Sequence, residues 1–343
     1  MPVRLARPRG RVWWIRLLLA LTVLNVVALS FVGLFVSRFS DAHWLGTVLS
    51  FAPKWPWLLP TVGLLVVWSL SAWFAPRRLL FVGGSGLLLS GALWLFAVAG
   101  FVVPFGGGGR GPRVRILTYN LGAKPPIPSA SIVRMLDQER VFAATFQECT
   151  LPFEDPAWQG WFTQKAFSQC FVARKAPFAV NVRDPKNFWD VGGSGLMSRF
   201  DLDTPAGPLG LVNVHLETPR DGFEALYTKR RAGIPDLEAV NRARRTEALT
   251  VRDWIGPQTD RVVIAGDFNA TARSDILREA FAGFTNAFSA VGFGFGSSKH
   301  TRWHAVRIDH VLVGPALAPV DVEVLASLGG DHRPLLVELS AAK

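Results

Sequence analysis

The stretch 262–270, VVIAGDFNA, decides how the rest of this chain is interpreted. It opens with an apolar run, which is typical of a buried strand. Asp267 and Asn269 follow, two residues apart, where the apolar run stops. A buried strand presents polar side chains in this way at the rim of a sheet. The stretch therefore predicts one part of a functional site, and the other parts must come from elsewhere in the chain.

Polar side chains also flank the other apolar runs of strand length. A single strand-terminal Asn or Asp is more often a turn or a helix cap than a catalytic group. So many strand ends of this kind are hard to explain by coincidence, and we expect their side chains to form one site. The runs cover residues 114–120, 141–148, 192–200, 209–217, 307–313 and 333–340, flanked by Asn120, Gln147, Glu148, His215, Asp309, His310, Asp331 and His332.

Two helices are predicted between these strands, at residues 129–140 and 235–255. Apolar residues of the second helix recur with the period of one buried face, and Arg244 fills a gap in that stripe. An arginine there is either a member of a structural ion pair or a substrate-binding group that reaches into the site. Residues 150–190 are rich in aromatic side chains and match neither pattern. Strands and helices interleave without regular alternation, which favours a mixed-sheet α/β sandwich.

Charge is distributed unevenly along the chain. Residues 1–104 contain nine of the 37 basic residues and one of the 26 acidic residues, so they carry +8 of the formal net charge of +11. The remaining residues carry only +3. Duplex nucleic acid is normally bound through many Lys and Arg contacts. The high isoelectric point is therefore better explained as a membrane-topology signal.

Apolar segments in residues 1–104 have about the 20 residues that a membrane-spanning helix needs. A cleaved signal peptide would explain only the first of them. A soluble helical pair so rich in tryptophan and so poor in charge would be hard to keep in solution. We predict spans at 17–36, 55–74 and 79–103, a Gly-rich linker at 105–112 and a globular domain at 113–343.

Basic residues predict the orientation of these spans. Arginines precede the first span, which places the N-terminus in the cytoplasm by the positive-inside rule. Three crossings then put the globular domain outside the cytoplasm, on a multi-pass protein of the plasma (inner) membrane. Further arginines just after the third span argue weakly for the opposite orientation.

The two cysteines could form a disulfide or remain as free thiols. Cys149 and Cys170 allow a disulfide if the domain lies outside the cytoplasm. Because Cys149 directly follows the strand-end residue Glu148, two buried thiols are the favoured prediction.

The polar set contains the groups that hydrolysis of a phosphate ester needs. Glu148, Asn120 and Asp331 supply hard oxygen ligands, which suit Mg²⁺ or Mn²⁺. The sequence lacks the clustered His and Cys spacing of a zinc site. Histidines that are not ligands remain available for proton transfer, and an aspartate partner raises the basicity of the ring.

The ordered motifs YN, QE, HLE, GDFN, IDH and GDHRP resemble those of the endonuclease/exonuclease/phosphatase superfamily. Its members include DNase I-like nucleases, neutral sphingomyelinases and inositol-polyphosphate 5-phosphatases. The resemblance covers about residues 113–341, and the N-terminal spans are similar to those of bacterial membrane-anchored members. It implies a four-layer α/β sandwich (DNase I-like) with its site at one edge of two packed sheets.

The resemblance also implies residue roles around a metal. Glu148 would be the principal metal ligand, with Asn120 and Asp331 close to the metal or its waters. Asp267 would orient or deprotonate the attacking water, and Asn269 would hydrogen-bond the phosphate.

The histidines would complete the site that the resemblance implies. His332, paired with Asp309, would act on the phosphoryl oxygens or serve as the base. His215 would assist the leaving group as a general acid or a stabilising charge. The tyrosine that some nucleases place in the middle of the domain has no counterpart, which weakens an abasic-endonuclease interpretation.

Together these inferences predict a membrane-anchored, Mg²⁺- or Mn²⁺-dependent phosphoesterase that hydrolyses a phosphodiester or phosphomonoester by in-line attack of water. Its substrate stays open between nucleic acid, a lipid headgroup and a small phosphate ester. The alternatives are an extracytoplasmic nuclease specifically, or a non-catalytic membrane receptor or scaffold on the same fold. Apart from the lipid bilayer around the spans, no protein partner is inferred.

Overall fold

The computed structural model describes residues 9–73, 75–104, 106–122, 125–175, 180–191 and 193–343. The chain divides into two compact units. The first, the helical unit, comprises Met1–Arg38 and Ala52–Phe101; the second, the sandwich unit, comprises Phe39–Phe51 and Val102–Lys343. The predicted membrane domain 1–104 therefore differs from the observed helical unit chiefly in one segment, because residues 39–51 belong to the sandwich unit.

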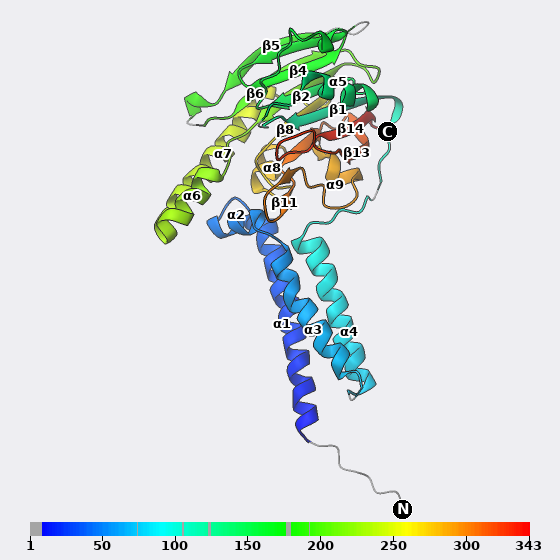
Figure 1. The fold of residues 1–343 in the computed structure, drawn as a ribbon, viewed down its shortest axis with the longest axis vertical. Coiled ribbons are helices and arrows are strands. Elements are labelled where there is room, and N and C mark those ends of the chain that lie inside the picture. Colours follow the sequence, from blue (N-terminus) through cyan, green and yellow to red (C-terminus); the bar gives the residue numbers. More distant parts are fainter. Residues whose placement is uncertain (1–8, 74, 105, 123–124, 176–179, 192) are drawn as a thin grey trace, which may run out of the picture. The chain divides into compact units, whose positions relative to one another are not determined.

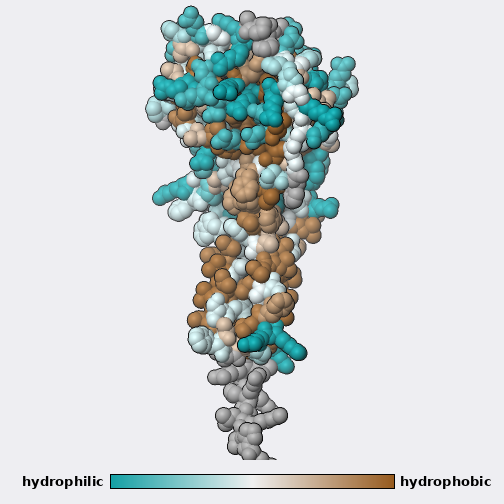
Figure 2. All heavy atoms as spheres, turned by 90° about the vertical axis from the view of Figure 1, so that its right-hand side faces the viewer, coloured by the Kyte–Doolittle hydropathy of each residue, from teal (hydrophilic) through white to brown (hydrophobic). Residues whose placement is uncertain are grey.

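The helical unit consists of apolar helices (Figure 1). Large apolar side chains cover their outer faces, which appear brown in Figure 2. Leu70, Phe81 and Leu88, for example, are 69%, 77% and 79% exposed. Helices that are apolar on their outer faces suit a lipid environment better than water. The elements are α1 (Arg9–Phe39), the 3₁₀ helix η1 (Trp55–Leu58), α3 (Leu59–Ser71), α4 (Arg77–Ala92) and the π-helix η2 (Leu93–Val98).

Two helices of the described residues, not three, are long and apolar enough to cross a membrane: Trp13–Phe39 and Arg77–Val98. The prediction of a full span at 55–74 is wrong, because the apolar helix there is the shorter Trp55–Ser71. At about 1.5 Å per residue, this helix falls short of a hydrocarbon core about 30 Å thick. It starts as a 3₁₀ turn that contains Pro56, and residue 74 lies outside the described residues.

The sandwich unit contains two six-stranded sheets and one small two-stranded sheet. The first large sheet has the order β13 (Leu317–Val324), β14 (Leu335–Ala341), β1 (Arg110–Asn120), β2 (Ala143–Gln147), β4 (Gln169–Arg174) and β3 (Trp161–Ala166). The second has the order β5 (Val180–Asn187), β6 (Leu196–Leu202), β7 (Leu209–His215), β8 (Val262–Asp267), β12 (Asp309–Val313) and β9 (Thr285–Asn286). The small sheet pairs β10 (Lys299–His300) with β11 (Ala305–Val306).

Apolar side chains form a core between the large sheets and one core on each outer face. Phe171 of the first sheet stacks on Phe200 of the second, with ring centroids 3.9 Å apart. Helix α5 (Ser129–Gln138) packs on the outer face of the first sheet, and α7 (Ile234–Ile255) and α8 (Asp275–Ala280) pack on that of the second. The predicted α/β fold with mixed sheets is therefore confirmed. The other helices are α2 (Trp44–Phe51), η3 (Pro156–Trp158), η4 (Trp189–Val191), α6 (Arg220–Lys229), η5 (Arg230–Gly233) and α9 (Ala287–Val291).

Most differences from the predicted elements lie at their ends. The helix predicted at 129–140 ends at Gln138, and the strand predicted at 192–200 is β6, whose partner residues begin at Leu196. Strand β1 begins at Arg110, inside the predicted linker 105–112, and residues 105 and 192 lie outside the described residues. The unassigned segment 150–190 supplies β3, β4 and β5.

Each large sheet has one parallel pair of strands near its centre. In the first sheet β1 runs parallel to β2, with Asn120 opposite Gln147. In the second, β7 runs parallel to β8, with His215 opposite Asp267. Strand β12 runs antiparallel to β8 and begins with Asp309 opposite Asp267. Because parallel strands end at the same edge of a sheet, residues distant in sequence meet there.

The favoured prediction of two free thiols is wrong, because Cys149 and Cys170 form a disulfide. Cys149 follows β2, and Cys170 lies in β4, which pairs antiparallel with β2 and places Cys170 opposite Phe146. Both cysteines are 1% exposed. The strand pairing that brings them together lies in the segment to which the sequence pattern assigned no structure.

Candidate active site

A carboxylate from each large sheet approaches the same asparagine. Nδ2 of Asn120 lies 3.0 Å from Oε1 of Glu148 and 3.0 Å from Oδ2 of Asp267. Asn120 and Asp267 are buried, whereas Glu148 is exposed. The end of β1 therefore joins the end of β2 to the end of β8, as the parallel strands predict.

The position of Glu148 depends on a neighbouring glycine. A Cβ atom on Gly122 would lie 2.4 Å from Oε2 of Glu148 and 3.1 Å from Oδ1 of Asn120, so a side chain at position 122 would displace this carboxylate from its observed place. Glu148 has a φ of 49°, in the left-handed region that side chains other than glycine rarely adopt. The backbone thus turns the carboxylate of Glu148 toward Asn120 at a solvent-facing rim. Sequence reasoning missed Gly122, although it lies two residues after the motif YN.

His332 and Asp309 form a buried pair beside this cluster. Nδ1 of His332 lies 2.9 Å from Oδ2 and 3.1 Å from Oδ1 of Asp309, and the two side chains are 3% and 0% exposed. Burial lowers the pKa of His332, but the carboxylates of Asp309 and Asp267 outweigh it and raise this pKa to about 9. Burial raises the pKa of Asp309. The raised pKa favours the protonated imidazole, whose Nε2 faces Asp267, 3.6 Å away.

Asp267 lies between two histidines. Oδ2 of Asp267 lies 3.8 Å from Nε2 of His215 and 3.6 Å from Nε2 of His332. Burial alone would raise the pKa of Asp267, but the charges of His332 and His215 and the N–H of Asn269 lower it below its usual value. Asp267 is therefore ionised at neutral pH although it is 2% exposed.

Asn269 is held by the backbone around it. Its N–H donates to Oδ1 of Asp267 at 2.9 Å, and its Nδ2 donates to the carbonyl of Leu216 at 2.9 Å. Its φ is 48°. A non-glycine residue keeps this conformation only where the surrounding contacts hold it. The motif GDFN therefore forms a tight turn that fixes both Asp267 and Asn269.

Asp331 is linked to this cluster by Lys299, which also contacts His332. Its side chain is 52% exposed, and its Oδ2 accepts a hydrogen bond from Nζ of Lys299 at 2.8 Å. The same Nζ lies 2.9 Å from Nε2 of His332. Lys299 was not predicted, because it belongs to the two-residue strand β10 (Lys299–His300), which has no periodicity to detect.

Arg244, predicted to bind substrate, lies at the edge of this group. Its side chain is 1% exposed and pairs with Asp41, and its Nη2 donates to the carbonyl oxygen of Asn269. The guanidinium thus contacts the backbone of a predicted site residue from behind. Of the two roles considered for this position, membership of an ion pair is the one that the contacts describe.

Two polar residues that flank strands point away from the site. Gln147 is buried and donates from Nε2 to Oδ1 of Asn213 at 2.7 Å, between the sheets. His310 is 1% exposed, with Nε2 2.8 Å from the carbonyl of Ala270, and burial lowers its pKa to about 3. His310 therefore does not compete with His332 for Asp309.

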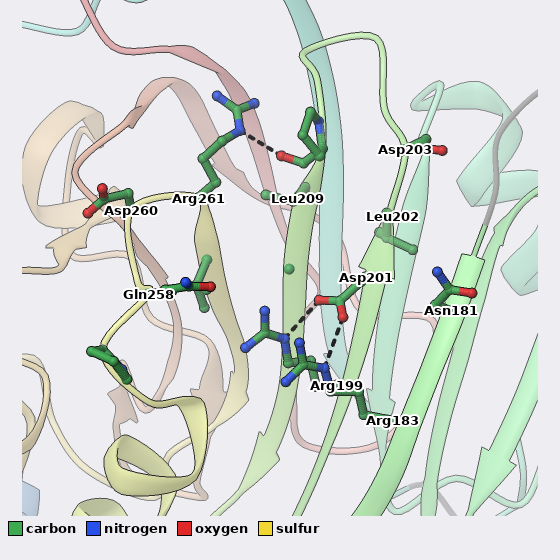
Figure 3. Close-up of a pocket in the computed structure, with 14 residues that line it drawn as sticks. Asn181, Arg183, Arg199, Asp201, Leu202, Asp203, Leu209, Gln258, Asp260 and Arg261 are labelled. Atoms are coloured by element: carbon green, nitrogen blue, oxygen red, sulfur yellow. Dashed lines mark hydrogen bonds and ion pairs between the residues drawn. The ribbon is translucent and has the colours of Figure 1, made fainter.

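Charged side chains also gather at the opposite end of the second sheet (Figure 3). A hollow of about 530 Å³ there is lined by the starts of β7 and β8 and by the end of β6. Nε of Arg199 and Nε of Arg183 lie 2.8 and 2.9 Å from different oxygens of Asp201. Asp201, one of the carboxylates that line this hollow, is thus already paired with two arginines, unlike Asp267 at the other end.

Comparisons with known proteins agree with this arrangement. A profile of the Endonuclease/Exonuclease/phosphatase family matches residues 117–332. A curated UPF0294 protein of Klebsiella pneumoniae (strain 342) is 26% identical over 160 residues, which are 40% of this chain and 59% of that protein, so this chain spans less than two thirds of that relative.

A solved structure shows the same fold over most of its length. An endonuclease/exonuclease/phosphatase family protein from Bacteroides thetaiotaomicron superposes with a TM-score of 0.50 at 15% identity, over 68% of this chain and all of that one. Truncated TDP2 of Caenorhabditis elegans superposes with a TM-score of 0.49 at 14% identity, over 67% of this chain and 98% of that one.

Proposed function

We propose, from the premise that this chain belongs to the Endonuclease/Exonuclease/phosphatase family, that it is a metal-dependent phosphoesterase. The observation that carries the proposal is the meeting of Glu148, Asn120 and Asp267 beside the pair His332–Asp309. Two sheets and five separate strand ends supply these groups, and each group has a use in hydrolysis of a phosphate ester. A scaffold without catalysis would not need them to converge.

The rim at Glu148 suits a hard divalent cation. Glu148 offers carboxylate oxygens, and Gly122 keeps the space beside them free of a side chain. The amide oxygen of Asn120, which accepts from the N–H of Gly122 at 2.9 Å, would use its second lone pair as a ligand. Mg²⁺ binds through one or two carboxylates and retains several waters, so it needs an open position. When bound, such an ion would polarise the phosphoryl oxygens and neutralise developing charge. Asp331, exposed and beside His332, is the further predicted ligand.

The buried carboxylates suit the cation less well. Asp267, Asp309 and His332 also offer ligand atoms that all lie within 4.8 Å of one another. Both carboxylate oxygens of Asp309, however, face Nδ1 of His332, and no side of this pair is open to a shell of water. We therefore assign the cation to the rim at Glu148, where an oxygen of Asp267 approaches Asn120 from the other sheet.

The remaining groups act on the water and on the phosphate. Asp267 is ionised and buried, so it can orient a water molecule and accept its proton. His332 is protonated at neutral pH, which favours a role as a cation toward the phosphoryl oxygens over a role as base. His215 contacts the same oxygen of Asp267 as His332 does and is partly exposed, with 22% of its side chain accessible. Its proposed role is to assist the leaving oxygen.

Lys299 supports an anionic substrate. Its ammonium nitrogen lies 2.9 Å from Nε2 of His332. When both groups are protonated, neither nitrogen can accept a hydrogen bond from the other. An anionic oxygen that accepts from both would relieve their repulsion. A phosphate group has such oxygens, and Asn269 on the neighbouring turn is the predicted further donor to it.

The proposed location is a membrane surface outside the cytoplasm. The exposed apolar faces of α1 and α4 support anchoring in a bilayer, and a disulfide between Cys149 and Cys170 is typical of an oxidising compartment. Residues 39–51 and 102–343 form one unit. Both must then lie on one side of the bilayer, which requires that the shorter helix α3 cross together with α4 or that neither crosses. This side is opposite the arginine-rich N-terminus if α1 crosses the bilayer.

Three classes of phosphate ester are candidate substrates. A phosphodiester of nucleic acid, a lipid headgroup and a small phosphate ester all fit the chemistry of the site. The near-neutral charge of residues 105–343 favours the latter two over duplex DNA, which is bound mainly through its phosphates by basic side chains.

The test uses the full chain in detergent micelles, because residues 39–51 belong to the sandwich unit. The purified protein is incubated with Mg²⁺ or Mn²⁺ and with bis(4-nitrophenyl) phosphate, sphingomyelin, single-stranded DNA or mannose 6-phosphate. We expect turnover of at least one substrate, abolition by EDTA and restoration by added cation.

Two variants make this test specific. Glu148→Ala and His332→Ala should each lower turnover by about 10³-fold, as loss of a catalytic acid, base or charge does. Asp260→Asn, an exposed carboxylate at the far end of the second sheet, is the control and should behave as the parent. Absence of turnover on all four substrates, or equal rates for all variants, would refute the enzyme and favour the scaffold.

A further inference from the structure

The segment Phe39–Phe51 connects two apolar helices but belongs to the sandwich unit. It consists of a turn that contains Ser40 and Asp41, followed by helix α2 (Trp44–Phe51). Ser40 and Asp41 are 0% and 5% exposed. Polar residues of a loop that only links two helices would be expected to face solvent. These residues are instead enclosed by other parts of the sandwich unit.

Ser40 and Asp41 bind the stretch that follows the motif GDFN. Oγ of Ser40 donates to the carbonyl of Arg273 at 3.0 Å and accepts from the N–H of Asp275 at 2.9 Å. The N–H of Asp41 donates to Oδ2 of Asp275 at 3.3 Å, and Oγ of Ser274 donates to Oδ2 of Asp41. The segment is thus hydrogen-bonded to the residues that begin α8 and that lie a few positions after Asn269.

Asp41 also forms an ion pair with Arg244 of helix α7. Nη1 of Arg244 lies 3.1 Å from Oδ1 of Asp41, and the side chains are 1% and 2% exposed. The same Nη1 donates to Oδ1 of Asn241 at 3.1 Å, and Nδ2 of Asn241 donates to Oγ1 of Thr47 at 2.7 Å. Buried charges need such partners, because a charge removed from water without one is unfavourable.

Arg244 connects Asp41 to the candidate active site. Its Nη2 donates to the carbonyl oxygen of Asn269. Asn269 in turn has a φ of 48° and donates its N–H to Oδ1 of Asp267. A continuous chain of bonds therefore runs from Asp41 through Arg244 and Asn269 to Asp267. A left-handed asparagine is held in this conformation by its surroundings, and Arg244 is the side chain that binds its carbonyl.

We propose that Asp41 and Arg244 are positioning residues for the turn 266–269, so that the segment between the apolar helices completes the catalytic site. The catalytic part of this inference rests on the proposed function, whereas the order of the turn does not. Neither residue touches substrate in this scheme. Asp41 fixes the guanidinium, and the guanidinium fixes the carbonyl of Asn269 and thereby the carboxylate of Asp267.

The experiment compares the full chain with Asp41→Asn, which keeps the shape of the side chain and removes its charge. Hydrogen–deuterium exchange of amides 266–275 measures the order of the turn, and hydrolysis of bis(4-nitrophenyl) phosphate with Mg²⁺ gives kcat and KM. We expect exchange in 266–275 to become about tenfold faster, as a local opening becomes more frequent. We expect kcat to fall about tenfold or more with KM within about twofold, because a misplaced catalytic group affects the transition state more than binding.

Matched variants distinguish positioning from general damage. Asp236→Asn breaks the ion pair of Lys229 with Asp236, 2.9 Å long and with side chains 59% and 45% exposed, and should match the parent in both measurements. Asp41→Glu restores the carboxylate and should recover part of kcat and of the slow exchange. Exchange in 266–275 and kcat of Asp41→Asn within about twofold of the parent would overturn the proposal.

Two further outcomes are also decisive. If the parent turns over no substrate, the proposed function fails, and the exchange measurement alone decides whether Asp41 orders the turn. If Asp41→Asn does not fold, Thr47→Val provides a milder test, because it removes the hydrogen bond that orients Asn241 beside Arg244 and, besides it, only a long bond of 3.4 Å to the carbonyl of His43. It should speed exchange in 266–275 by about threefold, and exchange equal to that of the parent would overturn the proposal.

Discussion

The two ends of the second sheet differ in the partners of their aspartate side chains. At the end where β6 finishes and β7 and β8 start, Asp201 is bound by Arg183 and Arg199 (Figure 3). At the other end, Asp267 pairs with two imidazoles and an asparagine, and it forms no ion pair with an arginine or lysine among the described residues. One end has balanced charges, and the other has carboxylates in excess.

This difference distinguishes the cluster around Asp201, in which the charges are paired, from the proposed reactive cluster around Asp267. A carboxylate held by two guanidinium groups has little capacity left for a cation or a proton. A carboxylate beside histidines and amides keeps that capacity, and its pKa depends on several neighbours at once. We therefore propose the site at the end where Asp267 lacks an arginine or lysine partner, because charge density alone does not distinguish the two ends.

The largest expected effect is at the unbalanced end. Asp267→Asn should lower kcat/KM by about 10³-fold, equivalent to about 4 kcal/mol, because the variant can neither orient nor deprotonate the water as an anion. Steady-state hydrolysis of the substrate identified for the parent measures it. An Asp267→Asn rate within about tenfold of the parent would show that this end is not the reactive one.

The second effect concerns Glu247, a buried carboxylate near the same end. It accepts hydrogen bonds from the N–H groups of Gly195 (2.9 Å) and Glu217 (2.6 Å), and burial raises its pKa to about 7. The folded state binds the Glu247 proton more tightly than the unfolded state, in which the pKa of the carboxyl is about 4.5. The stabilisation of the fold by protonated Glu247 is therefore complete below about pH 4.5 and is lost as the pH rises to about 7.

The shift corresponds to at most about 3 kcal/mol of stability between these pH values. Thermal unfolding of the full chain at pH 5 and pH 8 should therefore show a smaller pH dependence for Glu247→Gln than for the parent. Glu224→Gln changes an exposed carboxylate on α6 and serves as the control. Parallel pH profiles for Glu247→Gln and the parent would contradict the raised pKa.

A third change tests the space beside Glu148. Gly122→Ala adds a Cβ that would lie 2.4 Å from Oε2 of Glu148, so the carboxylate must move. We expect about a tenfold loss of kcat/KM, equivalent to about 1.4 kcal/mol, and weaker half-saturation by Mg²⁺. Gly91→Ala is the matched control, because no atom lies within 4 Å of its added Cβ. Unchanged Mg²⁺ dependence of Gly122→Ala would move the cation away from Glu148.

The smallest effect is expected at the balanced end. Asp201→Asn breaks two ion pairs, but Asp201 and Arg183 are 34% and 52% exposed, so solvent weakens the loss. Stability should fall by about 1 kcal/mol or less, seen as a small shift in thermal unfolding, and kcat/KM should not change. A large loss of activity in Asp201→Asn would show that the two ends are coupled and would break the comparison.

Much of the site was predictable because its residues follow apolar strands. Asn120, Glu148, His215 and Asp267 each end a run with a clear strand pattern, and parallel pairing brings such ends together. Lys299 was not predictable in this way, since it lies in a two-residue strand. The disulfide was not predictable either, because it depends on the pairing of β2 with β4.

Local patterns thus determined the class of the fold and most residues at the reactive end of the sheets, because periodicity and strand ends are properties of short stretches of chain. The tertiary structure decided how these residues are held. Asp41 lies 203 positions before Arg244 in the sequence, and no local pattern relates them. The same holds for the difference between Asp201 and Asp267, since the charge that balances a carboxylate comes from whichever strands the fold places beside it.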